Sequence, residues 1–383
     1  MSATVALPDG PLTFSGAGAG FARPGPRFTG RTAYAAAPVV ADPLAENVPG
    51  APAAVDWATT LRLRERLWSL GFGVAEGMDT AQRGMGLDYP ATRELIRRSA
   101  AAARAGGHAI VAGVATDQLP PGPASIDDLT KAYAEQLHDV QEAGAGPVLM
   151  ASRHLAAAAR SADDYLAVYG ELVARADQPV ILHWLGESFD PALAGYWGST
   201  DVATAAGTVL ELIGSHPAKI AGIKVSLLDA AVEIDLRRRL PAGVRMYTGD
   251  DFHYPELIKG DEQGFSHALL GVLATIAAPA AAALRALDTG DEQGYDSVLA
   301  PTVPLARQLF AAPTYYYKTG ITFLNWIAGQ QDHFTMVGGL QSGRSPRHLA
   351  TLLRLADAAG VLPDADLAAH RARAWLITAG LTR

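Results

Sequence analysis

The chain has no cysteine among its 383 residues. Disulfide bonds, thiolate catalysis and zinc sites built on cysteine are therefore excluded. No apolar run reaches the roughly 18 residues that a membrane-spanning helix needs, and the first residues lack the basic start and apolar core of a signal peptide. We therefore expect a cytoplasmic protein without a membrane span.

Basic residues are also scarce relative to acidic ones. The sequence has 31 Lys and Arg against 39 Asp and Glu, a formal net charge of −8, and no long basic run. Nucleic acid is therefore not an expected partner, because nucleic-acid binding relies on clustered positive charge. With 49% hydrophobic residues the chain can build a large core and serve as an enzyme or a binding protein.

Strand-like and helix-like segments alternate over most of the chain. The predicted strands are 32–40, 73–75, 108–114, 147–151, 179–185, 220–225, 244–248 and an apolar stretch at 266–276. The predicted helices between them are 57–70, 89–105, 126–143, 163–176, 201–214, 230–240 and 254–259. Eight such units predict an α/β fold of the closed (β/α)₈ TIM-barrel type. An open doubly wound sheet is the competing architecture, but the glycine-rich ligand loop typical of it is absent.

Three regions are expected along the chain. Residues 1–30 are predicted to form an N-terminal arm or short hairpin, residues 31–280 the barrel, and residues 281–383 a C-terminal helical extension packed on the barrel. The extension has predicted helices at 280–287, 298–310, 314–327, 346–359 and 364–379. Its Tyr315-Tyr316-Tyr317-Lys318 segment is interpreted mainly as packing.

Lys224 interrupts the apolar run Ala221–Ser226 on the sixth predicted strand. A lysine in a buried strand must find a partner or lose its proton, because desolvation favours the neutral amine. A neutral lysine amine attacks carbonyl groups. The alternative is a solvated lysine at an exposed strand tip.

Other polar residues follow neighbouring strands, and a TIM barrel gathers the carboxyl ends of its strands at one mouth. They are Glu76 and Asp79 after the second strand, Arg153 and His154 after the fourth, His183 on the fifth, Ser226 on the sixth, and Asp251 and His253 after the seventh. We expect these residues to orient a substrate around Lys224. Alternatively, one aspartate of Asp250-Asp251 caps a helix, and Arg153 and His154 lie at the surface.

Several segments resemble the dihydrodipicolinate synthase/N-acetylneuraminate lyase superfamily, of which the chain would be a divergent branch. They are Gly222-Ile223-Lys224 followed by Tyr247-Thr248-Gly249-Asp250-Asp251, with weaker matches at 110–114, 142–145 and 179–183. The resemblance implies a (β/α)₈ barrel with a C-terminal helical extension and no cofactor. It also implies a homo-oligomer, a dimer or tetramer. By position, Lys224 would form a Schiff base with the ketone of a substrate.

Two departures from the family pattern bear on the substrate. His183 stands where the family usually has a proton-relaying tyrosine, and a histidine can also move protons near neutral pH; alternatively it is a core histidine. The loop that normally supplies carboxylate-binding hydroxyls contains the acids Glu76 and Asp79. An acidic loop is a poor receptor for a carboxylate, so a polyhydroxylated, sugar-derived keto compound is predicted rather than pyruvate. The alternative for Glu76 is an ion pair with Arg83 or Arg153.

Three functions are therefore open. The favoured one is a Schiff-base lyase or aldolase in carbohydrate metabolism, with Lys224 as nucleophile and His183 as acid and base. The second is a divalent-metal-dependent barrel isomerase, epimerase or lyase that uses the oxygen and imidazole groups of the strand ends, although no H-x-H or H-E-x-x-H spacing is present. The third is a barrel that binds a small ligand without catalysis.

Overall fold

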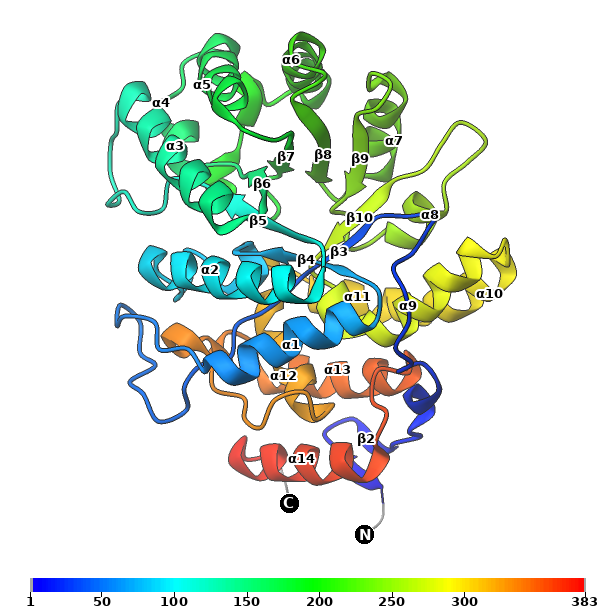
Figure 1. The fold of residues 1–383 in the computed structure, drawn as a ribbon. Coiled ribbons are helices and arrows are strands. Elements are labelled where there is room, and N and C mark those ends of the chain that lie inside the picture. The colour runs from blue at the N-terminus through cyan, green and yellow to red at the C-terminus, as the bar shows by residue number, and fades with distance from the viewer. Residues whose placement is uncertain (1–2, 382–383) are drawn as a thin grey trace. The chain divides into compact units, whose positions relative to one another are not determined.

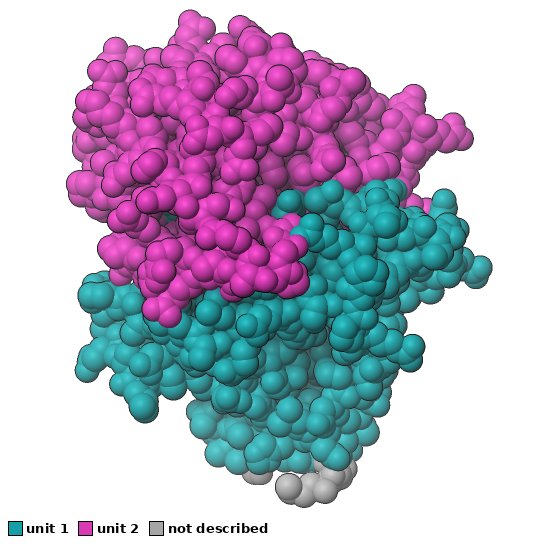
Figure 2. All heavy atoms as spheres, viewed as in Figure 1, with its two compact units in different colours: residues 1–72, 80–87, 271–383 teal, residues 73–79, 88–270 magenta. Residues whose placement is uncertain are grey.

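The computed structural model describes residues 3–381, which form two compact units (Figure 2). The first comprises Met1–Phe72, Thr80–Leu87 and Gly271–Arg383, and the second comprises Gly73–Asp79 and Asp88–Leu270. The units interleave along the chain. The division into an arm, a barrel and a helical extension near residues 30 and 280 stays a prediction. No helix within residues 3–381 is both long and apolar enough to cross a bilayer.

Eight parallel strands close into a barrel, which confirms the predicted (β/α)₈ TIM-barrel fold (Figure 1). Their order around the barrel is β10-β3-β4-β5-β6-β7-β8-β9. They are β3 (Ala33–Ala36), β4 (Gly73–Glu76), β5 (Ile110–Val114), β6 (Gly146–Leu149), β7 (Val180–Leu185), β8 (Ile220–Ser226), β9 (Arg245–Thr248) and β10 (His267–Leu270). All but β3 belong to the second unit.

Helices of the second unit follow its strands and lie outside them (Figure 1). They are α2 (Tyr89–Gly106), α3 (Ile126–Ala143), α4 (Arg153–Ala158), α5 (Ala162–Arg175), α6 (Val202–Ser215), α7 (Ala230–Arg239) and α8 (Tyr254–Lys259), with 3₁₀ turns η3 (Pro191–Leu193) and η4 (Tyr196–Gly198). Polar side chains start several of them: Asp88, Ser125 and Asp201 accept hydrogen bonds from first-turn amides. Gly107 and Gly144 end α2 and α3 in the left-handed conformation that glycine adopts at low cost.

The first unit contains an N-terminal hairpin and the helices of the C-terminal region. The hairpin pairs β1 (Thr4–Leu7) with β2 (Gly10–Thr13). The helices are α1 (Trp57–Ser69), α9 (Leu273–Asp288), α10 (Glu292–Leu299), α11 (Thr302–Leu309), α12 (Tyr317–Ile327), α13 (Pro346–Ala358) and α14 (Ala365–Thr378). The 3₁₀ turns are η1 (Ala17–Gly20), η2 (Asp79–Ala81, whose first residue belongs to the second unit), η5 (Thr314–Tyr316) and η6 (Val337–Ser342).

Two predicted elements are divided in the structure. The apolar stretch 266–276 contains the end of the barrel, at Leu270, and the start of α9, at Leu273. Both parts are buried, so a continuous apolar run could not distinguish strand from helix. The predicted helix 298–310 is interrupted at Ala300-Pro301, between α10 and α11, because proline favours the start of a helix over its interior.

Candidate active site

Lys224 lies on β8 and points into the barrel. It is paired in register with His183 on β7 and with Tyr247 on β9, and its residue is 8% exposed. The charge of Asp79, which follows β4, acts on its amine. Because three strands separate β4 from β8 in either direction, that charge can reach Lys224 only across the interior.

Two opposing effects act on the Lys224 amine. Burial lowers its pKa below that of a free lysine, and the negative charges of Asp79 and Asp251 raise it again. Burial is the larger effect, so the neutral amine forms at a lower pH than in water. The neutral amine has the lone pair that nucleophilic attack on a carbonyl carbon requires.

His183 is fully buried beside Lys224. Its Nε2 lies 3.3 Å from Ser226 Oγ, while its Nδ1 is buried without a hydrogen-bond partner within residues 3–381. Burial, and then the charge of Lys224, hold its pKa well below the usual range for histidine. His183 is therefore a neutral imidazole at physiological pH and can accept a proton.

Gly249 follows β9 and lets the chain approach Lys224 closely. Its amide donates a 2.8 Å hydrogen bond to the Val225 carbonyl. A β-carbon placed on Gly249 would overlap Ser226 Oγ and lie 2.7 Å from Lys224 Cε. A side chain at this position would therefore displace the two residues that project from the end of β8.

Asp250 and Asp251 have different surroundings. Oδ1 of Asp250 accepts hydrogen bonds from the amides of Phe252 and His253, and Oδ2 lies 2.9 Å from Nδ1 of His253. Asp250 thus braces the turn before α8, as expected for one aspartate of the pair, and it engages His253. Asp251 is the member whose charge acts on Lys224.

Glu76 is buried on the outer side of β4. Oε2 accepts a 2.7 Å hydrogen bond from Ser99 on α2, and Oε1 accepts one from the amide of Gly77. The described contacts of this carboxylate therefore run to α2 and to its own turn. The structure brings Asp79 of the same loop, and not Glu76, to the Lys224 amine.

Arg153 and His154, at the start of α4, also contact other groups. Arg153 is exposed and forms an ion pair with Asp190. The ring of His154 lies 3.2 Å from Thr116 Oγ1 and 3.1 Å from the Pro120 carbonyl. These contacts connect the loops that follow β5, β6 and β7. They agree with the alternative expectation, in which Arg153 and His154 lie at the surface and do not bind substrate.

Two residues in register with Lys224 and one buried acid on α7 were not predicted as candidate site residues. Tyr247 and His267 continue the in-register row from Lys224 across β9 and β10, and their rings lie 5.5 Å apart. Glu233 on α7 is buried, accepts a 2.7 Å hydrogen bond from Ser266, and has a pKa raised by burial to about 8. Nothing in the sequence of α7 marks Glu233 as buried, because its burial depends on what packs over the helix.

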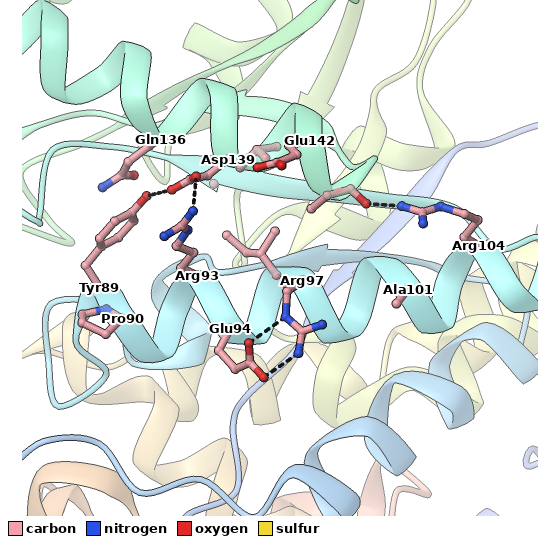
Figure 3. A pocket seen from close by; sticks show the side chains of 14 residues that line it. Tyr89, Pro90, Arg93, Glu94, Arg97, Ala101, Arg104, Gln136, Asp139 and Glu142 are labelled. Atoms are coloured by element: carbon pink, nitrogen blue, oxygen red, sulfur yellow. Dashed lines mark hydrogen bonds and ion pairs between the residues drawn. The ribbon is translucent and has the colours of Figure 1, made fainter.

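One cavity of about 690 Å³ lies between α2 and α3 on the outer side of the barrel strands (Figure 3). Lys224 is not among the residues that line it. Ion pairs line it, Arg93 with Asp139 at 3.0 Å and Arg97 with Glu94 at 2.7 Å. Among the residues described, no three His, Asp or Glu side chains are grouped so as to hold a metal ion.

Residues 15–381 match the model of a protein family whose description reads "Protein of unknown function (DUF993)". The chain belongs to this family. No curated protein sequence matches this chain.

Solved structures similar to this DUF993 protein include dihydrodipicolinate synthases. The enzyme from Aquifex aeolicus is 15% identical with a TM-score of 0.66, covering 87% of this chain and 99% of its own. The 4-hydroxy-tetrahydrodipicolinate synthase from Methylacidiphilum fumariolicum is 16% identical with a TM-score of 0.66, covering 88% and 98%. The dihydrodipicolinate synthase from Acinetobacter baumannii, described in complex with pyruvate, is 16% identical with a TM-score of 0.65, covering 87% of this chain and 100% of its own. The predicted resemblance is thus confirmed at the level of the fold.

Proposed function

We propose that this protein is a lysine Schiff-base lyase or aldolase that acts on a ketone-bearing small molecule. The observation that carries the proposal is a desolvated lysine inside the barrel, in register with a neutral histidine. The shared fold with dihydrodipicolinate synthases supports the same assignment.

The reaction would begin at Lys224 Nζ. The neutral amine adds to the ketone carbon, and the adduct takes up one proton and loses one water to give a protonated imine. This cation draws electrons from an adjacent C–C bond, which breaks to leave an enamine on the lysine. In the cleavage direction a base removes the proton of a substrate hydroxyl as that bond breaks, and the enamine is then protonated and hydrolysed, which restores the amine.

His183 is the proposed proton carrier. A neutral imidazole can take the hydroxyl proton and return it to the enamine carbon. Ser226 is the last residue of β8, and its Oγ, 3.3 Å from Nε2 of His183, would hold the ring or pass the proton. This pair would replace the tyrosine that the family resemblance implies.

The charges around the amine favour a ketone without a neighbouring carboxylate. Asp79 and Asp251 act on Lys224, and both would repel an anionic substrate. Carboxylates accept hydrogen bonds from hydroxyl groups, so we propose a polyhydroxylated, sugar-derived keto compound rather than pyruvate. Asp79, Asp251 and Ser226 would orient it. The substrate-binding roles of Glu76, Arg153, His154 and His253 stay predictions, as do the homo-oligomer and the cytoplasmic location.

Reductive trapping tests the proposal. The protein is incubated with dihydroxyacetone, hydroxyacetone or pyruvate together with cyanoborohydride, and the intact mass and modified peptide are determined. We expect adducts of the two hydroxyketones on Lys224, formed faster than that of pyruvate. Lys219, exposed just before β8, gives the matched control: Lys219→Met should label normally and Lys224→Met should not.

Two results would contradict this function. Equal labelling of exposed lysines and Lys224 would show that Lys224 has no special reactivity. Faster trapping of pyruvate than of either hydroxyketone would keep the chemistry and overturn the substrate class.

A further inference from the structure

A second, smaller cavity lies behind the strands that carry Lys224 and His183. Its volume is about 250 Å³, and its lining comes from the segments that follow β7 and β8. Trp184 forms part of it. Because successive strand residues face opposite sides, Trp184 faces away from the interior into which His183 and Lys224 point.

The lining of this cavity is acidic and aromatic. Glu187 and Asp229 supply carboxylates, and Ser188, Ser199 and Thr200 supply hydroxyls, whereas the lining has no Lys, Arg or His. Trp184 and Tyr196, both nearly fully buried, give it aromatic walls. Val202, unusually exposed for its type, adds an apolar edge. Such walls attract a cation that carries an apolar body.

Two helices begin beside the cavity, but their positive N-terminal ends do not make it an anion site. Asp201 caps α6 and Asp229 caps α7, so each positive helix end already has a carboxylate. Asp229 accepts both of its capping hydrogen bonds, from Ala231 and Val232, on Oδ1. Its second oxygen, Oδ2, is the one that can be offered to a ligand.

Backbone strain adjoins the same cavity. Only three non-glycine residues in the described part of the chain have positive φ, and two of them are Trp197 at 68° and Leu228 at 58°. Leu228 lies between the lining residues Leu227 and Asp229, and Trp197 follows the lining residue Tyr196. Bulky residues rarely adopt this conformation, and where they do it is often at a binding site.

We propose that this cavity binds a small organic ammonium ion, a protonated amine with a ring-sized apolar body. Glu187 and Asp229 hold the charge, and Trp184 and Tyr196 contact the body. The volume lies just below the range of about 300–1,000 Å³ typical of drug-sized ligands, which limits the occupant to a compact molecule. This site is separate from Lys224 and does not depend on its chemistry.

Three probes that share one cyclohexyl ring and differ in the charge of their polar group test the charge preference. Cyclohexylammonium, cyclohexanol and cyclohexanecarboxylate are titrated into the full chain, and the indole N–H of Trp184 is followed by NMR, assigned with Trp184→Phe. We expect saturable binding of the ammonium ion in the low millimolar range, as befits a probe of about seven heavy atoms. The alcohol should bind at least tenfold more weakly and the carboxylate not at all.

Paired variants locate the site. The double variant Glu187→Gln/Asp229→Asn removes both charges while asparagine keeps the helix cap, and it should weaken ammonium binding at least tenfold. Asp235→Asn, at an exposed acid on α7 away from the lining, and Lys224→Met should leave the affinity unchanged. Unchanged affinity in the folded double variant, equal binding of all three probes, or no Trp184 shift with the ammonium ion overturns the proposal.

Discussion

Polar residues at the strand ends of the second unit fall into two groups with different surroundings. Around β8 and β9, the side chains of His183, Ser226 and Asp251 act on or adjoin Lys224. At the end of β4, Glu76 accepts a hydrogen bond from Ser99. After β6, Arg153 forms an ion pair with Asp190. Residue types alone do not separate the two groups, because acids, bases and hydroxyls occur in both.

Strand register explains the difference. Lys224 on β8 pairs in register with His183 on β7. Ile181, two residues before His183 and so on the same face of β7, pairs with Val148 on β6, and Val148 pairs with Gly113 on β5. These residues share the inner face of the barrel because residues paired in register on parallel strands point to the same side. Glu76 on β4 pairs with Ala112. Ala112 precedes Gly113 and points to the opposite side, so Glu76 faces outward to α2. A shift of one residue thus separates a site carboxylate from a packing one.

Lys224→Met gives the largest expected effect on the inner group. Reductive trapping of dihydroxyacetone at this position should fall about a thousandfold or more, since methionine has no amine to add to the ketone. The fold should persist, because a neutral side chain of similar length takes the place of a buried amine. Circular dichroism and the thermal midpoint check the fold. A Lys224→Met protein that still traps the ketone at the wild-type rate would contradict the inner group's assignment.

Glu76→Ala is expected to act on stability and much less on trapping. It removes the carboxylate that accepts hydrogen bonds from Ser99 and from the Gly77 amide and opens a cavity, which should lower the free energy of unfolding by about 2–4 kcal/mol. Urea denaturation measures this loss. Glu76→Gln, which keeps one acceptor, should lose less. A fall in trapping without a fall in stability would move Glu76 into the inner group.

Gly249→Ala should reduce trapping by about tenfold to a hundredfold, because the added methyl carbon displaces Lys224 Cε and Ser226 Oγ. Gly243→Ala provides the comparison, since a β-carbon there meets no atom within 4 Å. Gly243 has positive φ, so this control should lose some stability while its lysine stays reactive. Equal trapping in the two folded variants would contradict the close approach at Gly249.

Asp251→Asn should shift the pH dependence of trapping. The aspartate charge raises the pKa of Lys224, so its removal lets the amine become neutral at a lower pH. The midpoint of the trapping rate against pH is therefore expected to move to lower pH, and Asp79→Asn should move it in the same direction. A midpoint that rises, or does not move, would show that these carboxylates do not act on the amine.

Arg153→Ala should have the smallest effect. Its ion pair with Asp190 lies at the surface, with 58% of the arginine side chain exposed, and such pairs contribute about 0–1 kcal/mol. Trapping should stay within about twofold of wild type, and urea denaturation should detect little loss. A large loss of trapping in a stable Arg153→Ala protein would return this arginine to the substrate-binding group.

The sequence predicted the barrel because strand and helix periods differ and alternate eight times. It also placed Lys224 on the correct strand, since one cation in an apolar run is visible without coordinates. It could not assign faces to Glu76 or Tyr247, because the strands are buried on both sides and their sequences do not alternate. Nor could it find Glu233, whose burial depends on what packs over α7.

The register between β7 and β8 has a consequence for engineering the protein. The spacing of His183 and Lys224 is set by the hydrogen-bonded ladder from Ile181 to Leu185, not by any loop. Exchange of the segments after these strands should therefore leave the separation of the His183 imidazole and the Lys224 amine unchanged. The strand pair holds these two groups as one fixed unit, and the loops around it can be varied.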